Sequence, residues 1–225
     1  MAVIHQTTMQ PTKLELLTTW LPTRQWHTGG EVRPARVGGF RLDDPAGEVG
    51  IEFMAMTDGE GDEATTYLVP MTYRAGPLEG AEHALIGTSE HGVLGTRWIY
   101  DGAHDPVLAA QLYALLTGRA QAQAQSLTDV PDPTVAVSPV AVESAAPAPD
   151  AELVRVTDSP DHTDVVVRAP GASAALTLRV RRVLDAATGA DPGADGQVTA
   201  EWRLPDGTTA RGVFAVAFTD LGSTV

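Results

Sequence analysis

The chain has 225 residues, of which 43% are hydrophobic and 20% are charged, and this is enough for one large globular domain or two small ones. Its formal net charge of −14 makes nucleic acid and anionic membranes poor partners, because like charges repel. The absence of cysteine excludes disulfides, thiolate zinc sites and a cysteine nucleophile. No secretory signal and no apolar stretch of about 18 residues is present, so we expect a cytoplasmic protein. We also expect that it has no cofactor and no metal site.

A capping box predicts the first helix. Thr12 and Glu15 form the pattern T-x-x-E, in which each side chain accepts a hydrogen bond from the backbone of the other residue. Leu14 and Leu17 then share one helix face, and Pro22 ends the helix because it has no N–H to donate.

Strand patterns follow the first helix, with the clearest alternation of apolar and polar side chains in the second of them. They cover residues 32–42, 48–56, 66–73, 84–87 and 93–100. A second helix is expected after Asp105, a good N-cap that precedes Pro106, and Gly118 is its expected end. The run 119–125 is a candidate for a polar continuation of this helix.

The rest of the chain differs in composition. Residues 126–150 are rich in proline and alanine and hold no aromatic side chain, which predicts an extended, semi-rigid linker. Residues 151–225 show alternating strand patterns separated by loops. We therefore predict an α+β fold. It consists of a domain at 1–125 with a curved antiparallel sheet and flanking helices, the linker, and a small antiparallel β module at 151–225.

Two motifs resemble one known family. The first motif, WLPTRQWH at 20–27, ends the opening helix, and the second motif, GVLGTRWIYDG at 92–102, precedes the second helix. Their order and spacing resemble the N-terminal cap domain of actinobacterial maltokinases and related sugar kinases, over residues 13–118. The resemblance implies shared ancestry of the cap and a place in maltose, trehalose or glycogen metabolism.

The resemblance does not extend to the chemistry of a kinase. Kinases hold nucleotide phosphates with a strand lysine and magnesium with an asparagine. This chain has a single lysine, Lys13, and no asparagine, and its one His-x-Asp pattern begins at His162 and leads into a valine run. We expect a non-catalytic cap-like protein that binds or modulates an enzyme of sugar metabolism. The alternatives are a glucan-branching enzyme, a partial sugar kinase or a glycan-binding module.

The run LRVRR at 178–182 has two interpretations. In a degenerate kinase N-lobe, Arg179 would stand where the phosphate-binding lysine stands. A planar guanidinium does not simply replace a compact ammonium, so we favour an amphipathic strand with solvated arginines. The histidines have no metal-ligand spacing, and we expect them at the surface.

Six residues in the two motifs are candidates for protein interaction or sugar stacking: Arg24, Trp26, Arg97, Trp98, Tyr100 and Asp101. Aromatic faces suit the C–H surface of a sugar, while packing in the core is the other interpretation of the tryptophans. The arginines can stack on rings or pair with Asp101. The expected partners are a carbohydrate-active enzyme, a second copy of the chain or a maltooligosaccharide, and no catalytic residue is nominated.

Overall fold

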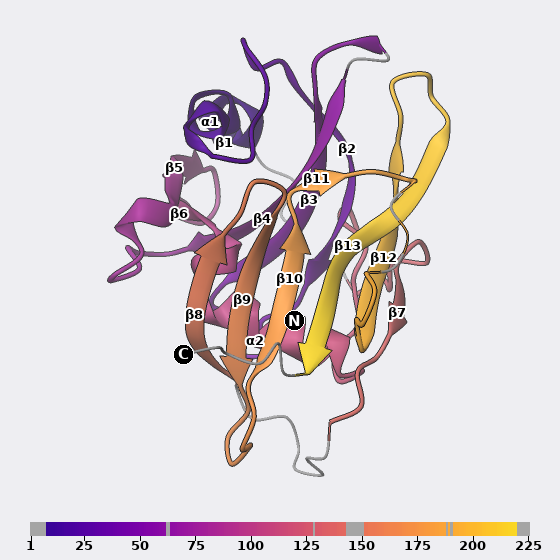
Figure 1. Ribbon diagram of the computed structural model, residues 1–225. Coiled ribbons are helices and arrows are strands. Elements are labelled where there is room, and N and C mark those ends of the chain that lie inside the picture. The colour runs from indigo at the N-terminus through magenta and orange to yellow at the C-terminus, as the bar shows by residue number, and fades with distance from the viewer. Residues whose placement is uncertain are drawn as a thin grey trace.

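The computed structural model describes residues 8–61, 64–127, 129–142, 151–187, 189 and 191–219. The strands in these residues form one open antiparallel sheet, with β1 (Met9–Gln10) at one edge and β8 (Glu152–Asp158) at the other. Figure 1 shows the sheet curving around helix α2 (Pro106–Leu116), while α1 (Lys13–Trp20) lies near the edge that β1 forms and packs on the other face of the sheet. The structure is mostly antiparallel sheet with few helices, which fits the α+β class expected from the sequence.

The other elements, in which η denotes a 3-10 helix, divide between the two parts of the chain. The first part contains η1 (Leu21–Thr23), β2 (Pro34–Leu42), β3 (Gly50–Asp58), β4 (Thr65–Arg74), η3 (Glu82–Ala84), β5 (Leu85–His91), β6 (Gly95–Asp101) and η4 (Gly102–His104). The second part contains β7 (Ala136–Ser138), β9 (His162–Arg168), β10 (Leu176–Arg181), β11 (Val183–Leu184), β12 (Gly196–Arg203) and β13 (Thr209–Thr219).

Both α-helices begin where the sequence places their caps. The Thr12 hydroxyl accepts from the N–H of Glu15 at 3.3 Å, and the Glu15 carboxylate accepts from the N–H of Thr12 at 2.7 Å. These two bonds complete the predicted capping box. At the start of α2, Asp105 accepts from the N–H of Val107 at 2.9 Å.

The end of α2 differs in one respect from the sequence expectation. Gly118 has a φ of 72°, a left-handed conformation that ends the helix as expected. The run 119–125 does not continue the helix, because the chain turns back at this glycine and becomes extended. Gln123 then forms a backbone bridge with Arg41 of β2.

The sheet continues from the first part of the chain into the second. β12 pairs with β2 where Trp202 lies opposite Gly38, and β11 pairs with β4. A Cβ on Gly38 would lie 2.9 Å from the carbonyl oxygen of Glu201 and 3.0 Å from the Cα of Trp202, so this close approach needs glycine. The strands of both parts of the chain thus belong to one continuous sheet. The division into two domains, with a β module at 151–225, stays a prediction.

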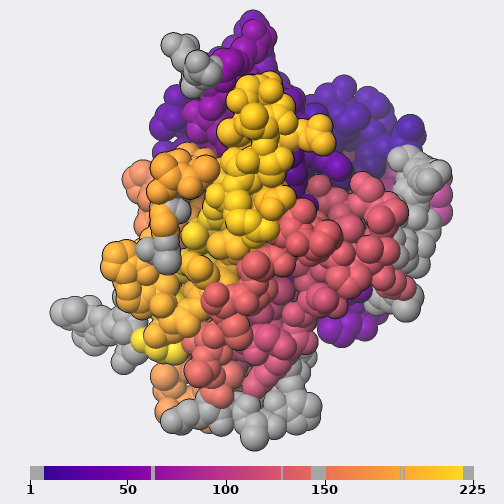
Figure 2. Space-filling model, turned by 90° about the vertical axis from the view of Figure 1, so that its right-hand side faces the viewer, coloured from indigo at the N-terminus to yellow at the C-terminus, as the bar shows by residue number. Residues whose placement is uncertain are grey.

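Part of the segment expected to be a linker is built into the fold. β7 pairs with β12, and the N–H of Val140 donates to the carbonyl oxygen of Leu116 at the end of α2 at 2.8 Å. Figure 2 shows the segment that follows α2, in pink to salmon, lying alongside the C-terminal strands. Its extended conformation agrees with its proline-rich composition. Residues 143–150 of the expected linker lie outside the described residues.

β3 separates two hydrophobic cores because alternate side chains of a strand point to opposite faces. Ile51 and Phe53 pack with α2 in the larger core, which also holds side chains from β9, β10, β12 and β13. Met54 and Met56 pack with Leu17 of α1 in the smaller core. The sequence pattern predicts the face of Ile51 and Phe53, and the second face is buried because α1 packs on it.

Candidate functional site

Two residues from the predicted motifs, Trp26 and Asp101, hold the side chain of Arg182. The Nη2 atom of Arg182 donates to Oδ2 of Asp101 at 2.6 Å, and its Nε donates to the hydroxyl of Thr163 at 2.8 Å. The guanidinium carbon lies 5.0 Å from the centre of the Trp26 ring. Arg182 is fully buried. We call Trp26, Asp101 and Arg182 the junction cluster, because it joins both motifs to the second part of the chain.

The junction cluster supplies most of what a buried cation needs. A buried charge is strongly destabilising unless it is paired and hydrogen-bonded. Arg182 has a carboxylate, a hydroxyl and an aromatic face around it, although its Nη1 has no hydrogen-bond partner among the described residues. Asp101 is oriented by the N–H of Ala103, which donates to its Oδ1 at 3.2 Å. Through these contacts the cluster attaches the first part of the chain to the second part.

Three of the six predicted site residues are buried: Trp26, Tyr100 and Asp101. Tyr100 lies on the opposite face of β6 from Asp101, because adjacent strand residues point to opposite sides. Its hydroxyl accepts from the N–H of Leu78 at 2.8 Å. The ring of Trp26, which is 1% exposed, packs between other side chains of the smaller core.

The other three predicted residues are half-buried, and they do not meet at one point. The guanidinium of Arg24 lies 4.9 Å from the centre of the Trp20 ring. Trp98 packs against a small cluster that contains Tyr100. Arg97 donates from Nη2 to the carbonyl oxygen of Leu94 at 2.8 Å. A role of these residues in interaction or sugar stacking stays a prediction.

The turn between β5 and β6 exposes two large apolar side chains, Val93 at 61% and Leu94 at 45%. Hydrogen bonds restrain this turn. His91 Nδ1 accepts from the N–H groups of both residues, at 3.3 and 3.1 Å, and Arg97 binds the carbonyl oxygen of Leu94. We call Val93 and Leu94 the hairpin tip. An exposed apolar pair on a pre-organised turn is a surface that a protein partner can cover at low entropic cost.

A second polar cluster also links the two parts of the chain. His104 Nε2 lies 3.5 Å from Oδ2 of Asp158, and its Nδ1 lies 3.1 Å from Nε2 of His83. The Thr163 hydroxyl donates to Oδ1 of Asp158 at 2.6 Å and so connects this cluster to Arg182. Burial raises the pKa of Asp158, but the hydrogen bonds from His104 and Thr163 outweigh it, and the pKa lies well below its usual value.

The arginine run 178–182 corrects one expectation. Its arginines are not simply solvated: Arg182 is fully buried, and Arg179, which is partly exposed, donates from Nε to Oδ1 of Asp164 at 2.8 Å on the neighbouring strand. Sequence reasoning misses the role of Arg182 because its partners come from distant segments. The available signal was the change from alternating arginines to the adjacent pair Arg181-Arg182, which places one of the two on the inner face.

Two more charged or titratable groups lie in unexpected places. His27, expected at the surface, is nearly buried, with its Nε2 at 2.9 Å from Oδ2 of Asp58. The single lysine, Lys13, donates to Oε2 of buried Glu52 at 2.5 Å. Burial raises the pKa of Glu52, but the Lys13 ammonium and the hydroxyl of Tyr73 lower it by more than burial raises it. The pKa of Glu52 therefore lies below its usual value. Each of these pairs joins segments that the sequence separates widely.

Over the part of the chain that the structure describes, no group of three or more His, Cys, Asp or Glu side chains is placed to hold a metal ion. In the same residues no helix is long and apolar enough to cross a membrane. No curated protein matches the chain. One family model does match: residues 20–105, which contain the first motif, the second motif and Asp105, fit the maltokinase N-terminal cap domain. This match confirms the resemblance and associates this segment, which is less than half of the chain, with maltokinase-like sugar metabolism.

Proposed function

We propose that this chain is a non-catalytic, cytoplasmic cap-like protein that binds or modulates an enzyme of maltose, trehalose or glycogen metabolism. The observation that carries the proposal is the junction cluster. Trp26 and Asp101 belong to the motifs of the matched segment, and both are occupied in holding Arg182. Because the polar and aromatic groups of these motifs stabilise the fold, they support a role of the chain as a rigid binding protein.

The chemistry of the charged groups supports action by contact. A kinase needs a free strand lysine for the phosphates and an asparagine for magnesium. The only lysine of this chain, Lys13, is paired with Glu52, and the sequence has no asparagine. Arg179, which stands in the position compared with the kinase lysine, is held by Asp164 through two hydrogen bonds.

The contact surface in this proposal is the hairpin tip. Val93 and Leu94 belong to the second motif, and the bonds to His91 and Arg97 present their side chains to solvent in a defined conformation. The matching surface on the enzyme would be an apolar recess with basic residues around it, because the chain carries a net charge of −14.

A binding assay with the full chain tests the proposal. A purified maltokinase and a purified glucan-branching enzyme are titrated with the wild type and with Val93→Asp/Leu94→Asp. We expect the wild type to bind at least one enzyme, and the double variant to bind it about tenfold more weakly or worse, because an introduced charge must be desolvated. Val154→Asp is the matched control, since Val154 is 46% exposed on β8, and it should leave the affinity unchanged.

Two results would contradict the proposal. One is a monomeric wild-type chain that binds neither enzyme and changes the turnover of neither. The other is turnover of ATP with maltose, or of linear glucan, by the purified chain alone, provided that one substitution in the chain abolishes it.

A further inference from the structure

Strand β8 forms a free edge of the sheet in the part of the chain that the structure describes. It pairs with β9 on one side, and the strand order ends there. Figure 1 shows β8 at the outside of the sheet, next to β9. The side of β8 that faces away from β9 therefore presents a row of backbone N–H and C=O groups with which another strand can pair.

A β-bulge at Val154 sets the direction of the charged side chains of β8. Glu152 lies opposite Arg168 of β9 and Arg155 lies opposite Val166, so Val154 has no residue opposite it. Arg168 and Val166 are two residues apart and share a face of the sheet, and Glu152 and Arg155 share that face with them. In a regular strand, residues three apart point to opposite faces. The bulge therefore places one negative and one positive side chain on the same face of the edge strand.

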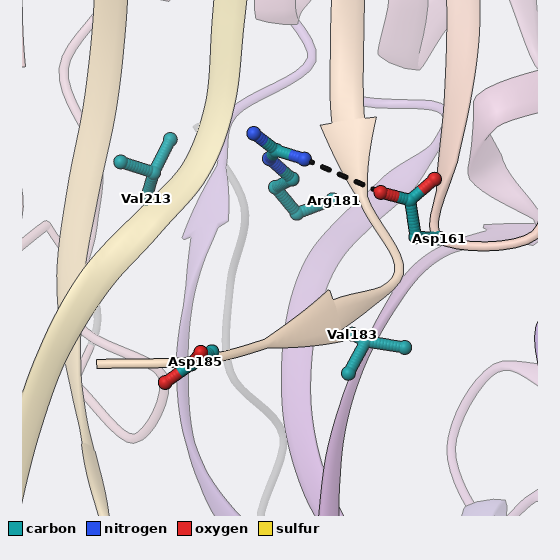
Figure 3. Close-up of a pocket in the computed structure, with 5 residues that line it drawn as sticks. All are labelled: Asp161, Arg181, Val183, Asp185 and Val213. Atoms are coloured by element: carbon teal, nitrogen blue, oxygen red, sulfur yellow. Dashed lines mark ion pairs between the residues drawn. The ribbon is translucent and has the colours of Figure 1, made fainter. Parts of the chain in front are cut away.

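These two charges have no partner within the chain, unlike the charges at the ends of the neighbouring strands. Arg181 at the end of β10 lies 3.5 Å from Asp161 and points toward it, as Figure 3 shows. Glu152 and Arg155 are both exposed, and neither forms an ion pair with another described residue. An edge whose charges have one sign repels a second copy of itself, whereas β8 carries one charge of each sign here and contains neither lysine nor proline.

We propose that two copies of the chain pair through β8, antiparallel and about a twofold axis at Leu153. In this register Glu152 of each copy lies opposite Arg155 of the other copy, so the dimer contains this ion pair twice. Leu153 lies opposite the same residue of the second copy, on the inner face that it shares with the buried Val167 of β9. The two sheets then form one sheet that runs through both copies.

The charge of the whole chain limits the strength of this dimer. Two copies with a net charge of −14 each repel one another. At physiological ionic strength, charges more than about 8 Å apart are largely screened, whereas the paired charges of the two β8 strands are in contact. One shared strand edge also buries less surface than the about 1,600 Å² of a standard interface. We therefore expect a reversible dimer with a Kd of about 100 µM.

Sedimentation equilibrium of the full chain, between about 5 and 500 µM, measures this Kd. Glu152→Arg brings two positive charges together twice in the dimer and is expected to raise the Kd about tenfold or more. The double variant Glu152→Arg/Arg155→Glu exchanges the two charges at constant net charge. Its Kd should return to within about threefold of the wild-type value, because opposite charges again face each other.

Glu48→Arg is the matched control. It makes the same change of net charge in the exposed turn between β2 and β3, and strands β9, β10, β13 and β12 separate this turn from β8 in the sheet. Its Kd should be no higher than that of the wild type, because the change only reduces the repulsion between copies. A Kd raised as much as in Glu152→Arg would contradict local pairing at β8.

Amide hydrogen exchange at low and at high protein concentration locates the contact. We expect residues 151–156 to gain protection at high concentration, because strand pairing satisfies their outward N–H groups. A chain that stays monomeric at about 500 µM would overturn the proposal. So would a charge-exchanged variant as weak as Glu152→Arg, or protection gained only outside β8. Glu152→Arg should bind an enzyme through the hairpin tip as the wild type does, so failure of the dimer and failure of the proposed function are separate results.

Discussion

The guanidinium of Arg182 lies 5.0 Å from the centre of the Trp26 ring, so the end of the first motif contacts a residue between β10 and β11. The same guanidinium is hydrogen-bonded to Asp101 of the second motif. One side chain from the second part of the chain thus fastens both motifs of the matched segment. Trp26 and Asp101 therefore stabilise the fold, and this role requires no catalytic chemistry.

Loss of the Arg182 charge should destabilise the protein strongly. Arg182→Met leaves Asp101 buried without its cation, which is expected to lower the free energy of unfolding by about 3 to 5 kcal/mol. Arg211→Met is the control, because Arg211 and its partner Glu201 are both exposed, and there we expect less than about 1 kcal/mol. Urea unfolding measures both. Equal small effects in the two variants would contradict a fastening role for Arg182.

Removal of the Trp26 ring should also be costly, for a different reason. Trp26→Ala leaves a cavity in the smaller core and removes the aromatic face from Arg182, and we expect a loss of about 3 to 5 kcal/mol. Trp98→Ala should lose less than half as much, because Trp98 is only half-buried. Denaturant unfolding followed by circular dichroism compares the two. A larger loss in Trp98→Ala would refute the assignment of Trp26 to the core.

The junction between β2 and β12 depends on a missing side chain. Gly38→Ala would place a Cβ 2.9 Å from a backbone oxygen of β12, which should force the strands apart at a cost of about 1 to 3 kcal/mol. Gly30→Ala is the matched control, since a Cβ at Gly30 meets nothing within 4 Å. Its melting temperature should stay close to that of the wild type, while that of Gly38→Ala falls. Similar melting temperatures in both variants would contradict a close contact at Gly38.

Acid should destabilise the fold through Glu52 and Asp158, whose pKa values are lowered in the folded state. At acid pH the unfolded chain binds protons more readily than the folded chain does. The contribution of these two carboxylates to the free energy of unfolding is therefore complete above their unfolded pKa of about 4, and it is lost as the pH falls through their folded pKa values. Urea unfolding between pH 7 and pH 3 should show this decline. In Lys13→Met the decline should be smaller, because burial without the ammonium raises the pKa of Glu52. An unchanged acid response in Lys13→Met would argue against this ion pair.

Local signals in the sequence determined the helix starts and most of the strands. Three signals act through bonds or dihedral angles within a few residues: the capping box at Thr12, the N-cap at Asp105 and the helix end at Gly118. Such effects can be predicted from neighbouring residues in the sequence. The two motifs likewise identified the matched segment, because their residues and spacing are local properties.

The tertiary structure alone decided which charged side chains are buried and how the two parts of the chain meet. Arg182 is inside because Asp101, Thr163 and Trp26 arrive from three separate segments, and no spacing rule relates those positions. The pairing of β12 with β2 has the same origin, since it depends on close approach at Gly38. Burial of a charge is favourable only where all its partners converge, and convergence is a property of the folded chain as a whole.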